Sequence, residues 1–316
     1  MFLGDYVAGD KYQGDHERGD KIVLGDRERG MARRRTQRDL SAAPPQAGGA
    51  PVAERFHGLF IGIDKCRSKR INHLTSAIRD ATALHAIFSD NIDDSGALLT
   101  DADATSESIR TALIELRSCS TPDDVVVVTF AGHGSDTHQI VTYDADPDDL
   151  ATTTISLEEF TDLACAVPAR LLLVVLDCCF SGAALRKLNT DLRPRTMSAD
   201  GPDLTTSLLS KVTGKARIVL TASSAEQRAW ESRLIGHGLL TQSLLTALLD
   251  AAGIAVDGLF DLRDLLKNVT ELVRANASGA GGVRQDPMQG MVLEGTVRWP
   301  VFTRGKRYEA FSRRRR

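Results

Sequence analysis

The chain has 316 residues and a formal net charge of −3 at pH 7, and 42% of its residues are hydrophobic, which suits a globular protein with one large domain and an appendage. So small a net charge points to no particular charged partner. No apolar run approaches the roughly 18 residues that would span a membrane, and the N-terminus lacks the layout of a secretory signal. The five cysteines are irregularly spaced, which argues against a disulfide framework or a zinc site and favours a reducing, cytoplasmic setting.

A short repeat opens the chain, in which a Gly-Asp pair recurs every five or six residues within residues 1–30. Two interpretations stay open: a disordered polar leader, or a stacking element that recruits an activating partner. Calcium binding by these aspartates has less support, because their spacing matches neither an EF-hand nor a nonapeptide repeat. Residues 31–55 are rich in Arg, Ala, Pro and Gly and predict a linker.

Buried strands alternate with amphipathic helices over residues 56–300. The apolar runs predict strands at residues 59–63, 97–100, 125–130, 171–176 and 216–222. Helical periodicity predicts helices at residues 71–89, 105–117, 156–166, 239–251 and 261–276. Continuously apolar strands indicate a sheet covered on both faces, so the expected fold class is an α/β sandwich with a mostly parallel central sheet flanked by helices. In such sheets, functional residues gather beyond the carboxyl ends of the strands.

Two of the predicted strands end in reactive side chains. His133 follows the valine-rich strand at residues 125–130, and Cys179 follows the strand at residues 171–176. A thiol needs a base to become a nucleophile near neutral pH, and a histidine supplies that base and later protonates the leaving amine. The backbone N–H groups of Gly134 and Cys179 are then candidates for an oxyanion hole. The alternative is a core histidine beside buried structural cysteines.

The motifs around these two residues resemble those of a known family. They read Phe-Ala-Gly-His-Gly-Ser over residues 130–135 and Asp-Cys-Cys-Phe-Ser-Gly over residues 177–182, and 46 residues (179 − 133) separate His133 from Cys179. Three further stretches match the same family, at residues 143–147, 220–224 and 236–241. All five resemble the caspase-like peptidases, most closely the bacterial caspase homologues and metacaspases. This resemblance implies the three-layer caspase–haemoglobinase sandwich and a cysteine endopeptidase.

The resemblance also assigns roles at the site. Metacaspases have Asp-Ser-Cys-His-Ser-Gly at the second motif, which implies that Cys179 is the nucleophile, His133 its base and Cys178 the equivalent of the serine. Eukaryotic caspases have Gln two residues before the nucleophile, where this chain has Asp177. A carboxylate there repels acidic side chains and pairs with Arg or Lys. The metacaspase pattern implies a second acid in the same pocket, Asp80, on the first helix.

Some details of the pocket stay open. Ala77 and Ala131 stand where polar residues are more common in metacaspases. Asp80 has the alternative of an ordinary solvated helix residue, and Asp177 that of a structural cap at a strand end. The expected substrates are proteins with exposed Arg or Lys.

Activation and cofactors are suggested by two polar stretches. Residues 186–215 form a basic insertion that an Arg-specific zymogen would cut in itself. The acidic residues 144–149 invite calcium binding, which several metacaspases require, although a solvated loop is the plainer alternative. Bacterial caspase homologues often look like effector modules attached to a sensing partner, which implies recruitment through the N-terminal repeat and a role in stress or antiviral defence.

Other classes of function are retained as alternatives. An inactive caspase-fold scaffold would keep the fold, but the intact His133 and Cys179 argue against it. Nucleic-acid binding would rest on the arginines at residues 33–35 and in the basic C-terminal tail at residues 301–316, and these clusters lack interleaved aromatic residues. The glycine-rich loop that binds nucleotide phosphates is absent from the sequence. We therefore expect neither nucleic-acid nor membrane binding.

Overall fold

The computed structural model describes residues 55–92, 96–135, 137–178, 216–223, 229–232, 236–250, 259–279, 284–293, 297–300 and 302–313. These stretches belong to one compact unit, Gly49–Arg316. The Gly-Asp repeat, residues 31–54, Cys179 and the insertion at residues 186–215 lie outside the described residues.

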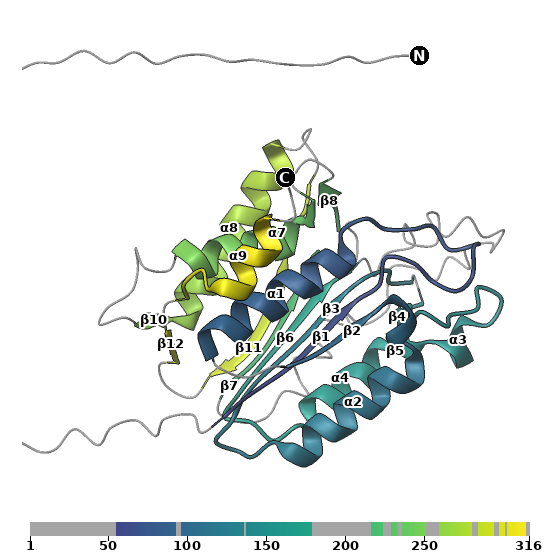
Figure 1. Ribbon diagram of the computed structural model, residues 1–316, viewed down its shortest axis with the longest axis horizontal. Helices are drawn as coiled ribbons and strands as arrows, with labels where there is room; N and C mark the ends of the chain where they lie inside the picture. Colours follow the sequence, from purple (N-terminus) through teal and green to yellow (C-terminus); the bar gives the residue numbers. More distant parts are fainter. Residues whose placement is uncertain are drawn as a thin grey trace, which may run out of the picture. The chain divides into compact units, whose positions relative to one another are not determined.

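A six-stranded sheet forms the centre of this unit, with the strand order β11-β7-β6-β3-β1-β2 (Figure 1). Its strands are β1 (Phe56–Gly62), β2 (Ala97–Thr100), β3 (Val125–Ala131), β6 (Leu171–Asp177), β7 (Ala216–Thr221) and β11 (Met288–Leu293). Neighbouring strands are parallel except β11, which runs antiparallel to β7. The predicted α/β sandwich with a mostly parallel sheet is therefore confirmed.

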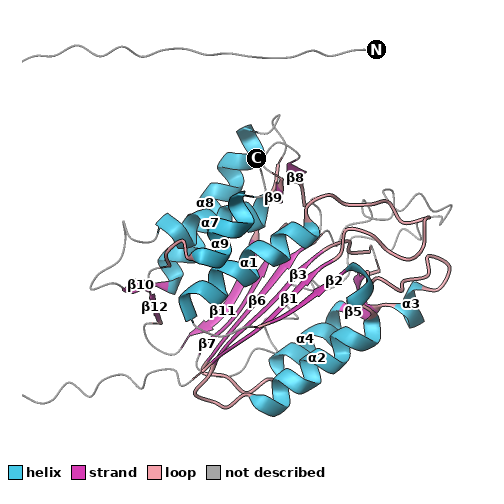
Figure 2. Cartoon of the chain, viewed as in Figure 1, coloured by secondary structure: helices cyan, strands magenta, loops and turns pink. Residues whose placement is uncertain are grey.

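Helices cover both faces of the sheet and form the two outer layers of the three-layer sandwich (Figure 2). One face packs against α1 (Ala77–Ile92), α7 (Leu239–Asp250) and α8 (Leu262–Gly279), and the other against α2 (Ser106–Cys119) and α4 (Leu157–Cys165). Helix α9 (Lys306–Arg313) packs on α1. The short elements are η1 (Asp101–Asp103), β4 (Gln139–Ile140), α3 (Leu150–Thr153), β5 (Ile155–Ser156), β8 (Glu231–Ser232), β9 (His237–Gly238), β10 (Leu259–Asp261) and β12 (Arg298–Pro300). None of the described helices has the length and apolarity of a membrane span.

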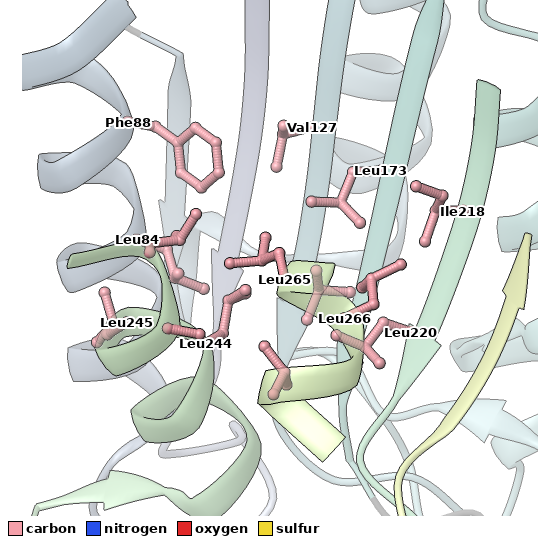
Figure 3. Packing of buried hydrophobic residues seen from close by; sticks show 14 of the residues in the cluster. Leu84, Phe88, Val127, Leu173, Ile218, Leu220, Leu244, Leu245, Leu265 and Leu266 are labelled. Atoms are coloured by element: carbon pink, nitrogen blue, oxygen red, sulfur yellow. The ribbon is translucent and has the colours of Figure 1, made fainter. Parts of the chain in front are cut away.

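Apolar side chains fill the space on both sides of the sheet. Along β3, Val126 and Val128 pack with the α2 and α4 side, whereas Val127 between them packs with the α1, α7 and α8 side. Figure 3 shows this second side, where the strand residues Val127, Leu173 and Ile218 face leucines of the covering helices. Burial of each such side chain contributes roughly 1.5–3 kcal/mol. A core on both faces is the physical reason that these strands are apolar throughout.

Helix α1 begins at Ala77 rather than at residue 71, where the helical periodicity starts. Residues 63–76 form a loop instead. The Asp64 carboxylate at the start of this loop accepts a hydrogen bond from the Ala77 amide at 2.8 Å. Since the first amides of a helix have no acceptor within the helix, Asp64 sets the point at which α1 begins. The loop is thereby left at the carboxyl end of β1, beside the ends of β3 and β6.

Candidate active site

A pocket lies beyond the carboxyl ends of β3 and β6. The register of these parallel strands pairs Ala131 with Asp177, so both strands end at the same level. His133 lies two residues beyond Ala131 and lines the pocket, together with Asp177, Asp80 and Gly238. Cys179 comes two residues beyond Asp177 in the chain and lies outside the described residues. The pocket thus collects three of the predicted site residues at the edge where parallel sheets place function.

His133 is buried, with 6% of its surface exposed, and its Nε2 atom lies 2.7 Å from the backbone carbonyl oxygen of Asn72. A carbonyl only accepts hydrogen bonds, so Nε2 carries the proton and donates it. In the neutral ring the lone pair is then on Nδ1, which is the form that a general base requires. Asn72 belongs to the loop before α1, and its role was not predicted because any residue type offers the same carbonyl.

Gly134 pairs with Ile140 in an isolated antiparallel bridge. The two hydrogen bonds of that bridge are made by its neighbours, through the His133 carbonyl and the Ser135 amide. The Gly134 N–H group is therefore not used by the bridge, which fits its predicted role as an oxyanion donor. The second predicted donor, the Cys179 amide, lies outside the described residues.

The carboxylates of Asp80 and Asp177 are both buried, with 2% and 8% of each residue exposed. Asp80 accepts hydrogen bonds from His237 Nδ1 at 2.6 Å and from the Gly238 amide at 3.0 Å. Asp177 Oδ2 accepts from the Thr241 hydroxyl at 2.7 Å and from the Thr241 amide at 3.0 Å. Asp80 is thus not a solvated helix residue. Asp177 lines the pocket and at the same time holds the first turn of α7.

Burial disfavours the ionised form of both aspartates in this pocket. It raises the pKa of Asp80 well above its usual value, the neighbouring Asp177 charge adds to the rise, and the hydrogen bond from the Gly238 amide opposes it. Burial also raises the pKa of Asp177, against the two hydrogen bonds from Thr241. Negative charge is costly here without a cation, so a bound cation is stabilised by the same carboxylates.

Glu231 brings a third carboxylate to the pocket from β8. It accepts hydrogen bonds from the Ser76 hydroxyl at 2.6 Å, and from the hydroxyl and amide of Thr75 at 3.0 and 3.2 Å. These donors immediately precede α1, the helix that carries Asp80. No local pattern in the sequence marks Glu231, because its place in the pocket arises from the packing of β8 beside the start of α1.

Gly238 allows the two aspartates to approach. A Cβ atom at this position would lie 2.5 Å from Asp177 Oδ2, closer than such atoms pack, and 3.1 Å from Asp80 Oδ2, which is a tight contact. The glycine in the stretch at residues 236–241 therefore has a physical reason: a larger side chain would displace the carboxylates.

Comparison with known proteins places this arrangement in a family. A family model described as the caspase domain matches residues 55–294, three quarters of the chain. The chain belongs to the caspase-domain family. The members of that family are cysteine peptidases, and the three-layer fold agrees with it.

Solved structures share the caspase fold at low sequence identity. Caspase-1 from Spodoptera frugiperda is 13% identical, with a TM-score of 0.55 over 81% of this chain and 97% of that one. A protein of Geobacter sulfurreducens is 15% identical, with a TM-score of 0.51 over 76% of this chain and 94% of that one. No curated protein sequence gives a significant match.

The acidic stretch at residues 144–149 serves the architecture of this caspase domain. Asp144 accepts hydrogen bonds from the amide and hydroxyl of Ser106 at the start of α2. Asp148 pairs with Arg70 at 2.6 Å, and Asp149 caps α3. Within the described ranges, no group of three or more His, Cys, Asp or Glu side chains could hold a metal ion. The carboxylates that invited a calcium interpretation are thus engaged in local hydrogen bonds and ion pairs.

Proposed function

We propose that this chain is a cysteine endopeptidase that hydrolyses protein substrates after Arg, and less readily after Lys, with Cys179 as nucleophile and His133 as base. The observation that carries the proposal is the pocket beside His133, in which Asp80, Asp177 and Glu231 all take part. Three carboxylates in the lining of the pocket repel an acidic side chain and attract a guanidinium, whose planar fork suits several oxygen acceptors.

The chemistry follows from the tautomer of His133. Its Nδ1 atom takes the proton of the Cys179 thiol, and the thiolate attacks the carbonyl carbon of the scissile peptide bond. The Gly134 and Cys179 amides stabilise the oxyanion. The imidazolium then protonates the leaving amine, and water hydrolyses the thioester with His133 again as the base. The Asn72 carbonyl holds the ring in the orientation that both proton transfers need.

The aspartates divide the work of substrate recognition. Both oxygens of Asp80 accept hydrogen bonds from His237 and Gly238, whereas the bonds from Thr241 reach only Oδ2 of Asp177. Within the described part of the chain, Oδ1 of Asp177 accepts no hydrogen bond. We therefore assign the direct contact with the substrate guanidinium to Asp177, and to Asp80 the role of a second carboxyl group whose ionised form the bound guanidinium favours.

Cleavage of matched fluorogenic peptides that end in Arg, Lys or Asp tests the proposal. We expect the wild-type chain to cleave the Arg peptide best and the Asp peptide not at all, and Cys179→Ala to cleave none. Asp177→Asn should lower kcat/KM for the Arg peptide by about 10–100-fold, the range of a charge-assisted hydrogen bond. Preferential cleavage of the Asp peptide would overturn the specificity. Repeating the assay with calcium and with a chelator decides the calcium question.

The insertion at residues 186–215 and the N-terminal repeat belong to the same proposal. We propose that the enzyme is a zymogen that cuts itself after a basic residue of the insertion, and that a partner bound to the Gly-Asp repeat brings copies together in a stress or defence response. Fragments that also form in Cys179→Ala protein would exclude cutting by its own site. A chain that cleaves no peptide, and fails to react with a thiol-directed peptidyl probe ending in Arg, would be an inactive scaffold.

A further inference from the structure

A second pair of cysteine and histidine lies at the amino ends of the central strands, away from the pocket. Cys119 is the last residue of α2, His57 is the second residue of β1, and Asp124 immediately precedes β3. The Cys119 Sγ atom lies 3.9 Å from His57 Nδ1. On the other side of the ring, His57 Nε2 lies 3.1 Å from Asp124 Oδ2. The imidazole thus lies between the thiol and the carboxylate and contacts both.

The carboxylate fixes the tautomer of the ring. Asp124 also accepts a hydrogen bond from the Thr121 amide at 2.8 Å and forms an ion pair with Arg55 at 3.4 Å. Although burial acts to raise the pKa of Asp124, the hydrogen bonds from Thr121 and His57 outweigh it and hold that pKa below its usual value. The ionised carboxylate accepts the proton of His57 Nε2, so the lone pair of the neutral ring is on Nδ1 and faces Cys119.

The surroundings of Cys119 are those of a reactive thiol. Cys119 is exposed, whereas Cys66 and Cys178 are buried and Cys165 is half-buried. The Arg55 guanidinium lies 3.3 Å from the Cys119 carbonyl oxygen, so a permanent positive charge is close. The Sγ atom also lies 3.4 Å from the Leu116 carbonyl oxygen, a second acceptor within reach of the thiol proton. An accessible sulfur beside a base, with a cation held at its backbone, meets the conditions under which cysteines react selectively. A purely structural cysteine would be covered by apolar side chains.

We propose that Cys119 is a modification site that forms mixed disulfides with low-molecular-weight disulfides, with His57 as its base. The proton of the thiol passes to His57 Nδ1, and the sulfur attacks one sulfur atom of the disulfide. The new S–S bond forms as the old one breaks, and the displaced thiolate takes the proton back from His57. The disulfide is the oxidant, and no other reactant is needed.

This site is independent of the proposed protease activity. The seven residues of β3 separate Asp124 from the pocket, which corresponds to about 20 Å of strand. The reaction requires neither Cys179 nor His133.

The test uses full-length Cys179→Ala protein, treated with oxidised glutathione at pH 7 and mapped by mass spectrometry. A base positioned beside a thiol speeds its reactions, because it takes up the proton as the sulfur attacks. We therefore expect Cys119 to react about tenfold faster in the folded chain than in the same chain unfolded in urea. Equal rates in the two states, or a slower reaction in the folded chain, would overturn the proposal.

Two variants connect the rate with His57. His57→Gln should lower the rate of Cys119 modification about tenfold, to that of the unfolded chain, while the circular dichroism spectrum stays the same. His73→Gln, which alters an exposed histidine near the other end of the sheet, should leave the rate unchanged. Equal rates in both variants would exclude His57 as the base. The comparison of folded with urea-unfolded chain needs no substitution at His57, so it decides the proposal even if that variant fails to fold.

Discussion

Asp177 lines the candidate pocket, and burial there raises the pKa of its carboxyl group. A carboxyl group whose pKa is raised in the folded state favours folding while it is protonated. That contribution is complete below the unfolded pKa of about 4 and is lost as the pH rises through the folded pKa. The folded chain therefore loses stability between acidic and neutral pH through the same side chain that we assign to substrate recognition.

Asp177→Asn should remove this loss of folding stability at higher pH. The amide oxygen can still accept the hydrogen bonds from Thr241, and the ionised form is gone. We expect the free energy of unfolding at pH 7 to rise relative to the wild type, because the variant cannot form the buried carboxylate that burial disfavours. The difference should disappear near pH 4. Urea denaturation at both pH values measures it, with the exposed Asp103→Asn as the control; a loss of stability at pH 7 would contradict this prediction.

Gly238→Ala should displace the carboxylates. The new methyl group would lie 2.5 Å from Asp177 Oδ2, and overpacking of this kind costs roughly 1–3 kcal/mol. We expect a lower free energy of unfolding together with a loss of Arg-peptide cleavage. The matched control is Gly279→Ala at the end of α8, where nothing lies within 4 Å of the added atom, and it should leave both measurements unchanged or slightly improve stability. Full activity in the Gly238 variant would show that the pocket does not need this close approach.

At the scale of elements, α9 depends on α1 for its beginning. The Asp90 carboxylate accepts hydrogen bonds from the Tyr308 amide at 2.8 Å and the Arg307 amide at 3.1 Å. Asp90 thus caps α9 as an N-cap residue does, although it belongs to another helix. Near this cap, the Phe88 ring meets the rings of Trp299 and Phe302 edge to face, with centroids 5.8 and 5.1 Å apart. The segment that composition alone describes as a basic tail contains a helix docked on the domain.

Asp90→Ala should release α9. Loss of an N-cap costs about 0.5–2 kcal/mol, and α9 has no fully buried residue, only the partly buried Tyr308 and Phe311 that pack against the core. We expect hydrogen exchange of the amides at residues 306–313 to accelerate by about tenfold. Glu309→Ala in the same helix removes only an exposed pair with Arg313 and should change the exchange little. Protection that is equal in the two variants would mean that other contacts hold α9.

The elements that the sequence predicts best are those that a single local pattern specifies. The apolar runs give β3 and β6 almost to the residue, and the predicted helices at residues 105–117 and 156–166 correspond to α2 and α4. The edge strand β11 was not predicted, since Met-Gln-Gly-Met lacks alternation and its pairing with β7 is tertiary. Chemical pattern and family resemblance led to the aspartates and His133. Asn72 and Glu231 contribute through loop and strand packing, which no short pattern encodes.

At the scale of the whole molecule, β6 and β7 are neighbours in the sheet, although residues 178–215 separate them in the chain. Their register joins six pairs of residues, from Leu171 with Ala216 to Leu176 with Thr221. Helix α1 from the first part of the chain also packs against α7 and α9 from the second. A cut within the insertion therefore breaks one covalent connection and none of these contacts.

Introducing a specific protease site within residues 186–215 of Cys179→Ala protein tests whether the two parts stay together after cutting. After cutting, we expect two bands on a denaturing gel, one peak in gel filtration at the mass of the uncut chain, and a single unfolding transition. Separation of the fragments without denaturant would show that the covalent link, rather than the sheet, holds the two parts together.

The pocket residues are divided between these two parts of the chain. Asp80, His133 and Asp177 precede the insertion, and Glu231 and Gly238 follow it. Neither part alone carries a complete set of pocket residues. If the two parts are produced from separate genes, we expect neither to have the proposed activity by itself, because hydrolysis requires that they meet on a shared sheet. The fold thus has the form of a split reporter, in which the proposed peptide cleavage would record the encounter of two polypeptides.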